Sequence, residues 1–149
     1  MEYKNLDHVT ALAGVSAEPP RPMGRDERIK RWIDLLSADP RRQLVALLEV
    51  EYLPAGDRLK YRSEASPLTV AYEDPLLRAQ GLRGDTFGDA LTFFELSERQ
   101  LHHAFCSCHV GMRLSSGSAA TRLRSMMRRE RMSQFFSTGV QRMWRTVTG

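Results

Sequence analysis

The chain has 149 residues, of which 42% are apolar and 27% are charged, a composition that suits one soluble domain with a modest core. No apolar run approaches the roughly 20 residues that a membrane-spanning helix needs, so we expect no membrane partner. Early charges and the lack of an apolar segment near the N-terminus argue against a secretory signal. We therefore expect a cytoplasmic protein with reduced thiols.

The net charge of +4 is unevenly distributed along the chain. Residues 1–110 hold 14 Lys and Arg against 17 Asp and Glu, a net charge of −3, whereas residues 111–149 hold eight Arg and one acid, a net charge of +7. A basic segment on a mildly acidic body favours DNA or an acidic protein as a partner. The alternative is a solvated helix face, because Arg is the usual base throughout the chain.

The first residues differ in character from the rest. Residues 1–23 include the stretch AEPPRPMG, which has three prolines and no hydrophobic period, and this predicts a partly flexible N-terminal arm. Residues 24–149 predict a single helical domain, in which residues 118–147 form a basic C-terminal helical segment.

Residues 25–37 predict the first helix of that domain. Its apolar side chains recur at the spacing of one helix face, at Ile29, Trp32, Ile33 and Leu36. A second helix is expected to follow and to end before Pro54, because Asp39 is a good N-cap and Pro40 suits the first helical position. The two helices should form an antiparallel αα-hairpin.

Residues 54–73 predict a loop, because two prolines and a glycine interrupt any long period. The segment LTVAY within it leaves open whether the loop contains a strand. Asp74 followed by Pro75 repeats the signal for a helix start, and Gly81 suits the end of that short helix.

The best-marked helices come next. Thr86 resembles a helix start, and a helix through FGDALTFFE follows it. Ser97 and Gln100 match the S-x-x-Q capping box, which predicts that a second helix begins at Glu98. Gly111 suits the residue after the end of that second helix.

The chain continues with the longest predicted helix. Ser118 is expected to cap it, Phe136 to lie near its end, and Gly139 to interrupt it before a last amphipathic turn or two. Together these segments predict a small all-α single-domain bundle of about six or seven helices, containing αα-hairpins, one of them like a helix-turn-helix. We expect its core to include Trp32, Leu44, Leu48, Leu91, Phe94, Leu101 and Phe105.

The stretch ALTFFELSERQLHHAF, residues 90–105, has the layout of a helix-turn-helix, in which Leu96 would fill the turn. Its second half, LSERQLHHAF, resembles the first DNA-reading helix of AraC-type transcription regulators, which follow the pattern LS-x-R-x-L-x-R-x-F. The resemblance covers about sixteen residues and implies a role in reading DNA. Glu95 stands at the turn position where glycine is usual, and the family's second, tandem motif is not found.

Nucleic-acid association is the function that we expect, through the hairpin over residues 86–109 and the basic C-terminal helix. The side chains expected to contact DNA are Arg99, His102, His103, Arg122, Arg124, Arg128, Arg129 and Arg131. The alternative is a protein–protein interaction module or homo-oligomer, in which the Arg- and Met-rich C-terminal helix docks on an acidic partner or a second copy.

A further alternative is a metal site. On a helix, His102, Cys106 and His109 share one face at i, i+4 and i+7, and imidazole and thiolate are ligands that zinc prefers. Cys108 falls on the buried stripe instead. Two cysteines on different faces argue against a disulfide and against a redox pair, and apart from this zinc alternative we expect no cofactor.

Signatures of catalysis are missing from the sequence. It has no G-x-S-x-G, P-loop, H-E-x-x-H or Rossmann glycine fingerprint. Cys106 with His102 or His109 could form a nucleophile and base, but these residues are expected on an exposed helix face rather than in a cleft. We therefore expect a non-enzymatic binding or regulatory protein.

Overall fold

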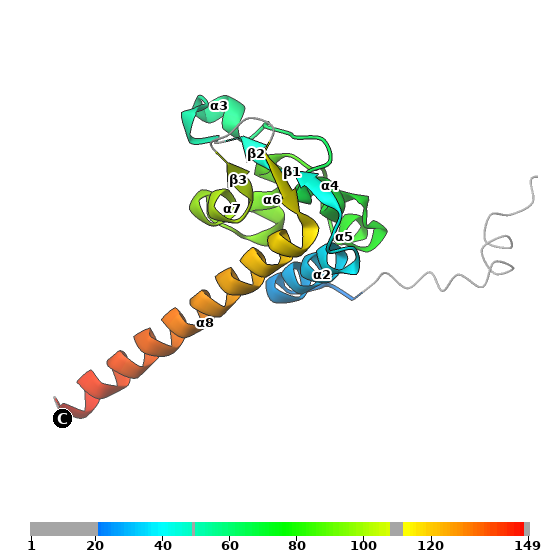
Figure 1. Cartoon of the computed structure of the whole chain (residues 1–149). Coiled ribbons are helices and arrows are strands. Elements are labelled where there is room, and N and C mark those ends of the chain that lie inside the picture. The colour runs from blue at the N-terminus through cyan, green and yellow to red at the C-terminus, as the bar shows by residue number, and fades with distance from the viewer. Residues whose placement is uncertain (1–20, 49, 108–111, 148–149) are drawn as a thin grey trace, which may run out of the picture.

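Helices make up most of the fold (Figure 1). The computed structural model describes residues 21–48, 50–107 and 112–147. Within these ranges the helices are α2 (Arg25–Ala38), the 3-10 turn η1 (Val50–Tyr52), α3 (Ala55–Arg58), α4 (Pro67–Glu73), α5 (Pro75–Ala79), α6 (Phe87–Phe94), α7 (Glu98–Phe105) and α8 (Ser116–Val147). The seven α-helices of the described part confirm the predicted all-α class.

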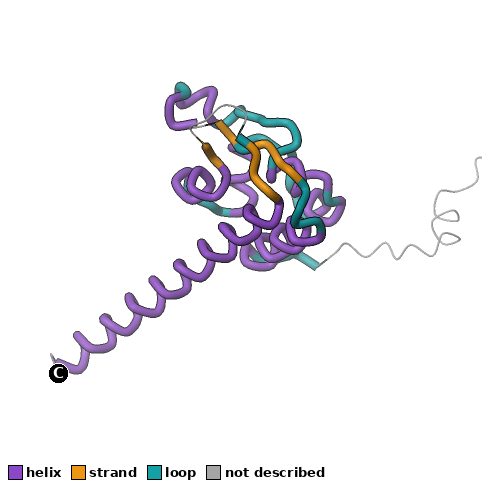
Figure 2. Tube along the Cα trace, viewed as in Figure 1, coloured by secondary structure: helices purple, strands orange, loops and turns teal. Residues whose placement is uncertain are grey.

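Within the described ranges, four short strands form two separate pairs, drawn in orange in Figure 2. The antiparallel pair joins β1 (Gln43–Val45) to β4 (Arg113–Ser115). The parallel pair joins β2 (Leu47–Leu48) to β3 (Cys106–Ser107). Strands β1 and β2 occupy the segment after Pro40 for which a helix was predicted, so that prediction is wrong.

Long-range pairing explains why this segment is extended. Leu44 is fully buried and lies opposite Leu114, while its neighbours Gln43 and Val45 are exposed, which is the in–out alternation of a strand. The same alternation leaves Leu48 39% exposed and buries Leu47 in its place, so the expected position of Leu48 in the core is wrong. Asp39 does not begin a helix but follows the last residue of α2 as its C-cap.

Residues 54–73, expected to form a loop, contain α3 and α4. Helix α4 begins by the same rule as α5, because Ser66 accepts a hydrogen bond from the backbone of Thr69 at 3.4 Å and Pro67 occupies the first helical position. At α5, the Asp74 carboxylate accepts from the Leu77 backbone, also at 3.4 Å, as the Asp-Pro signal predicts. The missed signal was therefore Ser followed by Pro.

The core centres on Trp32 of α2. Its indole ring stacks on Phe94 of α6, with ring centroids 4.3 Å apart, and contacts Phe105 of α7 at 4.9 Å. Its Nε1 donates a hydrogen bond to the Pro67 carbonyl at 2.9 Å, so the buried indole has a polar partner. Of the other predicted core residues, Leu44, Leu101 and both phenylalanines are fully buried, and Leu91 is partly buried.

Helix α8 starts against the body and then extends away from it (Figure 1). Its first turns bury Ala119, Ala120 and Leu123 completely, and small side chains there allow close approach to α2 and α7. The helix begins at Ser116, before the expected cap at Ser118, and continues through Gly139, so the predicted interruption is wrong. A glycine inside a helix costs only about 1 kcal/mol, which a long helix tolerates.

Most of the predicted arm, residues 1–20, lies outside the described residues. Residues 21–23 contact the end of α5, because the Gln80 side chain accepts from the Met23 backbone at 2.7 Å and donates to the Arg21 carbonyl at 3.1 Å. No helix in the described part of the chain combines the length and the apolar character needed to cross a membrane.

Candidate nucleic-acid interface

Helices α6 and α7 are the two helices of the predicted helix-turn-helix-like hairpin, and residues 95–97 join them. Glu95 adopts a left-handed conformation, with φ 51° and ψ 46°, which ends α6. Ser97 then begins α7 with a complete capping box. Its side chain accepts from the Gln100 backbone at 3.3 Å, and the Gln100 side chain accepts from the Ser97 backbone at 2.7 Å.

Two arginines of α2 contact Glu95 and fix the turn to that helix. The Arg28 guanidinium lies 2.5 Å from the Glu95 carboxylate, and the Arg25 Nε donates to the Glu95 carbonyl at 3.3 Å. A left-handed non-glycine residue costs about 1–2 kcal/mol, and these contacts offset part of that cost. Both helices of the hairpin are therefore held to α2, at the turn by arginines and in the core by Trp32.

The outward surface of α7 is mixed in charge. Arg99 and His103 are exposed, and Glu98 is paired with Arg58 at 3.1 Å. His102 is partly buried, and its Nδ1 lies 3.8 Å from the Glu51 carboxylate. Of the three residues that the sequence assigned to the reading helix, Arg99 and His103 are thus the accessible ones.

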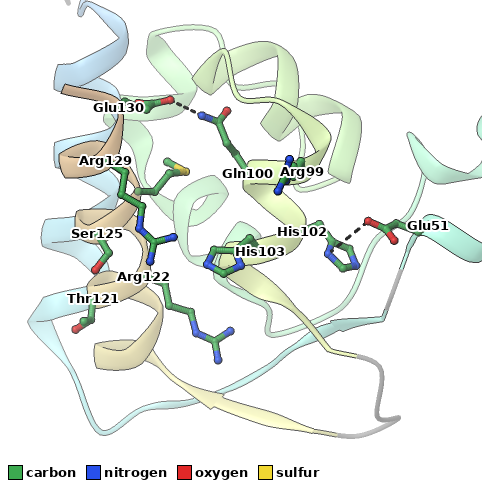
Figure 3. A pocket seen from close by; sticks show the side chains of 11 residues that line it. Glu51, Arg99, Gln100, His102, His103, Thr121, Arg122, Ser125, Arg129 and Glu130 are labelled. Carbon is green, nitrogen blue, oxygen red and sulfur yellow. Dashed lines mark hydrogen bonds and ion pairs between the residues drawn. The ribbon is translucent and has the colours of Figure 1, made fainter. Parts of the chain in front are cut away.

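A groove of about 600 Å³ separates α7 from the first turns of α8 (Figure 3). We call it the α7–α8 groove. Side chains from the two helices face each other across it, with His103 pointing from α7 toward Arg129 on α8. Its lining residues are Glu51, Arg99, Gln100, His102, His103, Thr121, Arg122, Ser125, Met126, Arg129 and Glu130.

The electrostatic balance of this groove is positive. Three arginines line it against two carboxylates, and one of these carboxylates, Glu130, is already paired with Arg25, at 2.9 Å and 3.2 Å. Gln100 also donates to Glu130, so α2, α7 and α8 meet at this one carboxylate. The arginines Arg99, Arg122 and Arg129 thus dominate the charge of the groove.

Arg122 is oriented by the end of α7. Its Nη1 donates to the Ala104 carbonyl at 3.2 Å, one of the last carbonyls of that helix, which lack partners within the helix. One guanidinium edge is used in this contact. Because a guanidinium carries five N–H donors, other donors of Arg122 are left to bind an anion in the groove.

The five arginines that the sequence grouped on α8 divide between two flanks of the helix. Arg122 and Arg129 line the α7–α8 groove, whereas Arg124, Arg128 and Arg131 lie on the flank that faces α2. At about 100° per residue, Arg124 is rotated about 200° around the helix from Arg122, which accounts for the division. The arginines therefore form two basic surfaces.

Sequence reasoning missed the polar residues Gln100, Thr121 and Ser125 of the groove. A signal for the last of these was present, because Ser125 lies three residues after Arg122 and four before Arg129, so the three share one helix face.

The predicted extension of α7 to residue 110 is wrong, which removes the helix face assigned to zinc. Helix α7 ends at Phe105, and Cys106 has the extended angles φ −83° and ψ 156° because it begins β3 and pairs with Leu47. His109 and Cys108 lie outside the described residues. Among the residues that are described, no cluster of three or more His, Cys, Asp or Glu could hold a metal ion.

Comparisons with known proteins give no information on the function of this site, so its function is inferred from its side chains. No protein-family model, curated protein or solved structure matches the chain. A fold alone does not assign a function, and the α6–α7 hairpin with the charged groove beside it is the feature that suggests one.

Proposed function

We propose that this chain is a non-enzymatic binding protein that associates with duplex DNA through α7 and the adjoining side of α8. One observation carries the proposal. Arg99 of α7 and Arg122 and Arg129 of α8 line one groove beside the exposed surface of a helix-turn-helix-like hairpin. Such an arrangement offers a reading helix and phosphate-binding cations on the same side of the molecule.

The side chains of the groove suit phosphate. Guanidinium groups bind phosphate oxygens through two parallel N–H donors, and the Ser125 hydroxyl adds a neutral donor nearby, whereas the Thr121 hydroxyl donates to the Gly117 carbonyl at 2.9 Å. Arg122 and Arg129 are seven residues apart, or about 10.5 Å along the helix, so they can contact different phosphates. These contacts position the protein without reading the sequence.

The exposed residues of α7 are suited to base edges. Arg99 can donate in pairs to the acceptors of guanine in the major groove, and His103 offers a further ring N–H. The Glu98 carboxylate can accept from cytosine, but its pairing with Arg58 opposes this use. We therefore assign direct readout of base edges to Arg99 and His103. Such readout would make DNA binding depend on the base sequence, which suits a regulatory protein.

The test is a titration of duplex DNA at several salt concentrations. Wild type should bind at about 50 mM salt and weaken steeply as salt rises, because each arginine–phosphate contact releases counterions and contributes about −0.9 to the log–log slope. The double change Arg122→Ala and Arg129→Ala should flatten the slope by about two.

A matched control removes the same charge elsewhere. Arg41 and Arg83 are exposed and lie outside the groove, so changing both to alanine should leave the slope near that of wild type. Circular dichroism of each variant checks that α8 remains folded. Absence of binding at low salt, or equal slopes for the two double variants, would overturn the proposal.

A further inference from the structure

The second basic surface of α8 lies on its other flank, against α2. Here the two helices border a groove of about 380 Å³, which we call the α2–α8 groove. Figure 1 shows α2 beside the first half of α8. The residues that line the α2–α8 groove are Lys30, Ile33 and Asp34 of α2 and Arg124, Met127, Arg128 and Arg131 of α8.

The groove combines an apolar floor with a basic rim. Ile33 and Met127 are 6% and 7% exposed, so they form the bottom of the groove. Lys30 and the three arginines are exposed around it, against a single carboxylate, Asp34, among the lining residues. Methionine adapts its shape to different apolar side chains, which suits it to the floor of a docking site.

The existing contacts of the rim do not prevent it from binding a partner. Arg131 lies 3.6 Å from Asp26, but both side chains are more than half exposed, and exposed pairs of this kind are weak. Arg124 donates to the Ser37 hydroxyl at 2.6 Å through one nitrogen, which leaves its other donors available. Arg128 is exposed on the rim between them.

We propose that the α2–α8 groove docks an acidic protein segment that inserts one apolar side chain between its carboxylates. The basic rim is complementary in charge to Asp and Glu side chains. The apolar floor of Ile33 and Met127 can bury an aliphatic side chain. A protein segment carries such a side chain, whereas the phosphate backbone of a nucleic acid does not. A volume of about 380 Å³ lies at the lower end of the range for small-ligand sites, so it accommodates side chains of a segment rather than a folded domain.

This docking is independent of the proposed DNA association. The two grooves lie on opposite flanks of α8, so a segment in one leaves the arginines of the other accessible. The partners proposed for the two basic surfaces thus differ, and variants on each flank distinguish them.

The experiment uses two fluorescent peptides of about a dozen residues with equal negative charge. One is built from Glu and Leu, and the other replaces each Leu by Ser. Wild type should bind the Leu peptide at least about tenfold more tightly, because burial of one leucine side chain supports such a factor. Equal affinity for the two peptides would reduce the interaction to charge attraction and overturn the proposal.

Two double variants locate the peptide. Arg124→Ala with Arg128→Ala should weaken binding of the Leu peptide about tenfold and leave the salt slope for DNA unchanged. Arg122→Ala with Arg129→Ala is the matched control, and it should leave peptide binding unchanged whether or not DNA binds. If the Arg124→Ala and Arg128→Ala variant instead flattens the salt slope for DNA and binds the Leu peptide as tightly as wild type, this surface belongs to the nucleic-acid interface and the proposal is wrong.

Discussion

The indole ring of Trp32 lies nearly parallel to the ring of Phe94, at an interplanar angle of 19° and a centroid distance of 4.3 Å. Because Phe105 contacts the same indole, one side chain of α2 supports both helices of the hairpin that carries the candidate site. The position of α7 relative to the body therefore depends on this aromatic cluster.

Trp32→Ala should lower the free energy of unfolding by about 3–5 kcal/mol, because it removes a fully buried indole and leaves a cavity among aromatic rings. Chemical denaturation measures the loss. Trp32→Phe is the matched variant, since it keeps a ring but removes the hydrogen bond to Pro67, and it should cost less. A loss below about 1 kcal/mol in the alanine variant would contradict the central place of Trp32.

Asp74 should make stability depend on pH. Hydrogen bonds from Arg31, at 3.0 Å and 3.1 Å, lower the pKa of the nearly buried Asp74 carboxyl below its usual value. A lowered folded-state pKa means that the stabilisation is present above the unfolded pKa of about 4 and is lost as pH falls through the folded pKa.

Asp74→Asn should therefore lower stability at pH 7 and weaken the loss of stability below about pH 4. Urea denaturation between pH 7 and pH 3 measures both effects. Asp57→Asn, which changes an exposed carboxylate, is the control for the loss of one negative charge. An Asn variant at position 74 with the same pH dependence as wild type would show that this ion pair does not contribute.

Glu95→Gly tests the left-handed residue of the turn. Glycine removes the conformational cost of about 1–2 kcal/mol, while the pair with Arg28 that is lost, in which the Glu95 side chain is 60% exposed, contributes about 1 kcal/mol. We expect stability equal to wild type or higher by up to about 1 kcal/mol. Glu95→Gln keeps the conformational cost and loses the charge, so thermal denaturation should rank it below the glycine variant.

Gly88 should not tolerate a side chain. A Cβ there would lie 2.8 Å from the Leu59 carbonyl oxygen, a backbone atom that cannot move alone, because the amide of Gly88 donates to the same carbonyl. Gly88→Ala should cost about 1–3 kcal/mol. Gly56→Ala is the matched control, since nothing lies within 4 Å of its added Cβ, and it should be neutral or slightly stabilising.

Local signals predicted three of the helix starts, whereas the starts expected at Asp39 and Ser118 were wrong and the start at Ser66 was missed. The caps at Asp74, Thr86 and Ser97 act on backbone groups within three residues, so the sequence around each is enough to identify it. The same is true of the apolar stripe on α2, which is buried at Ile29 and at the three other expected positions. These features depend on few distant contacts.

Features that depend on contacts between distant parts of the chain could not be predicted from local sequence. Leu44 lies in a strand because it pairs with Leu114, and α7 stops at Phe105 because Cys106 pairs with Leu47. The local strand propensities of these residues do not predict either pairing. The division of the α8 arginines between two grooves depends on how that helix is rotated against its neighbours, which periodicity alone does not specify.

The burial of Ala119, Ala120 and Leu123 in α8 also orders events during synthesis. Helix α2 emerges from the ribosome about a hundred residues before Met127 completes the contact with it. At about 5–20 residues per second, the side of α2 that contacts α8 stays uncovered for roughly 5–20 s. Both basic surfaces are lined by residues of α8, so a message truncated between α7 and α8 yields a chain without either of them.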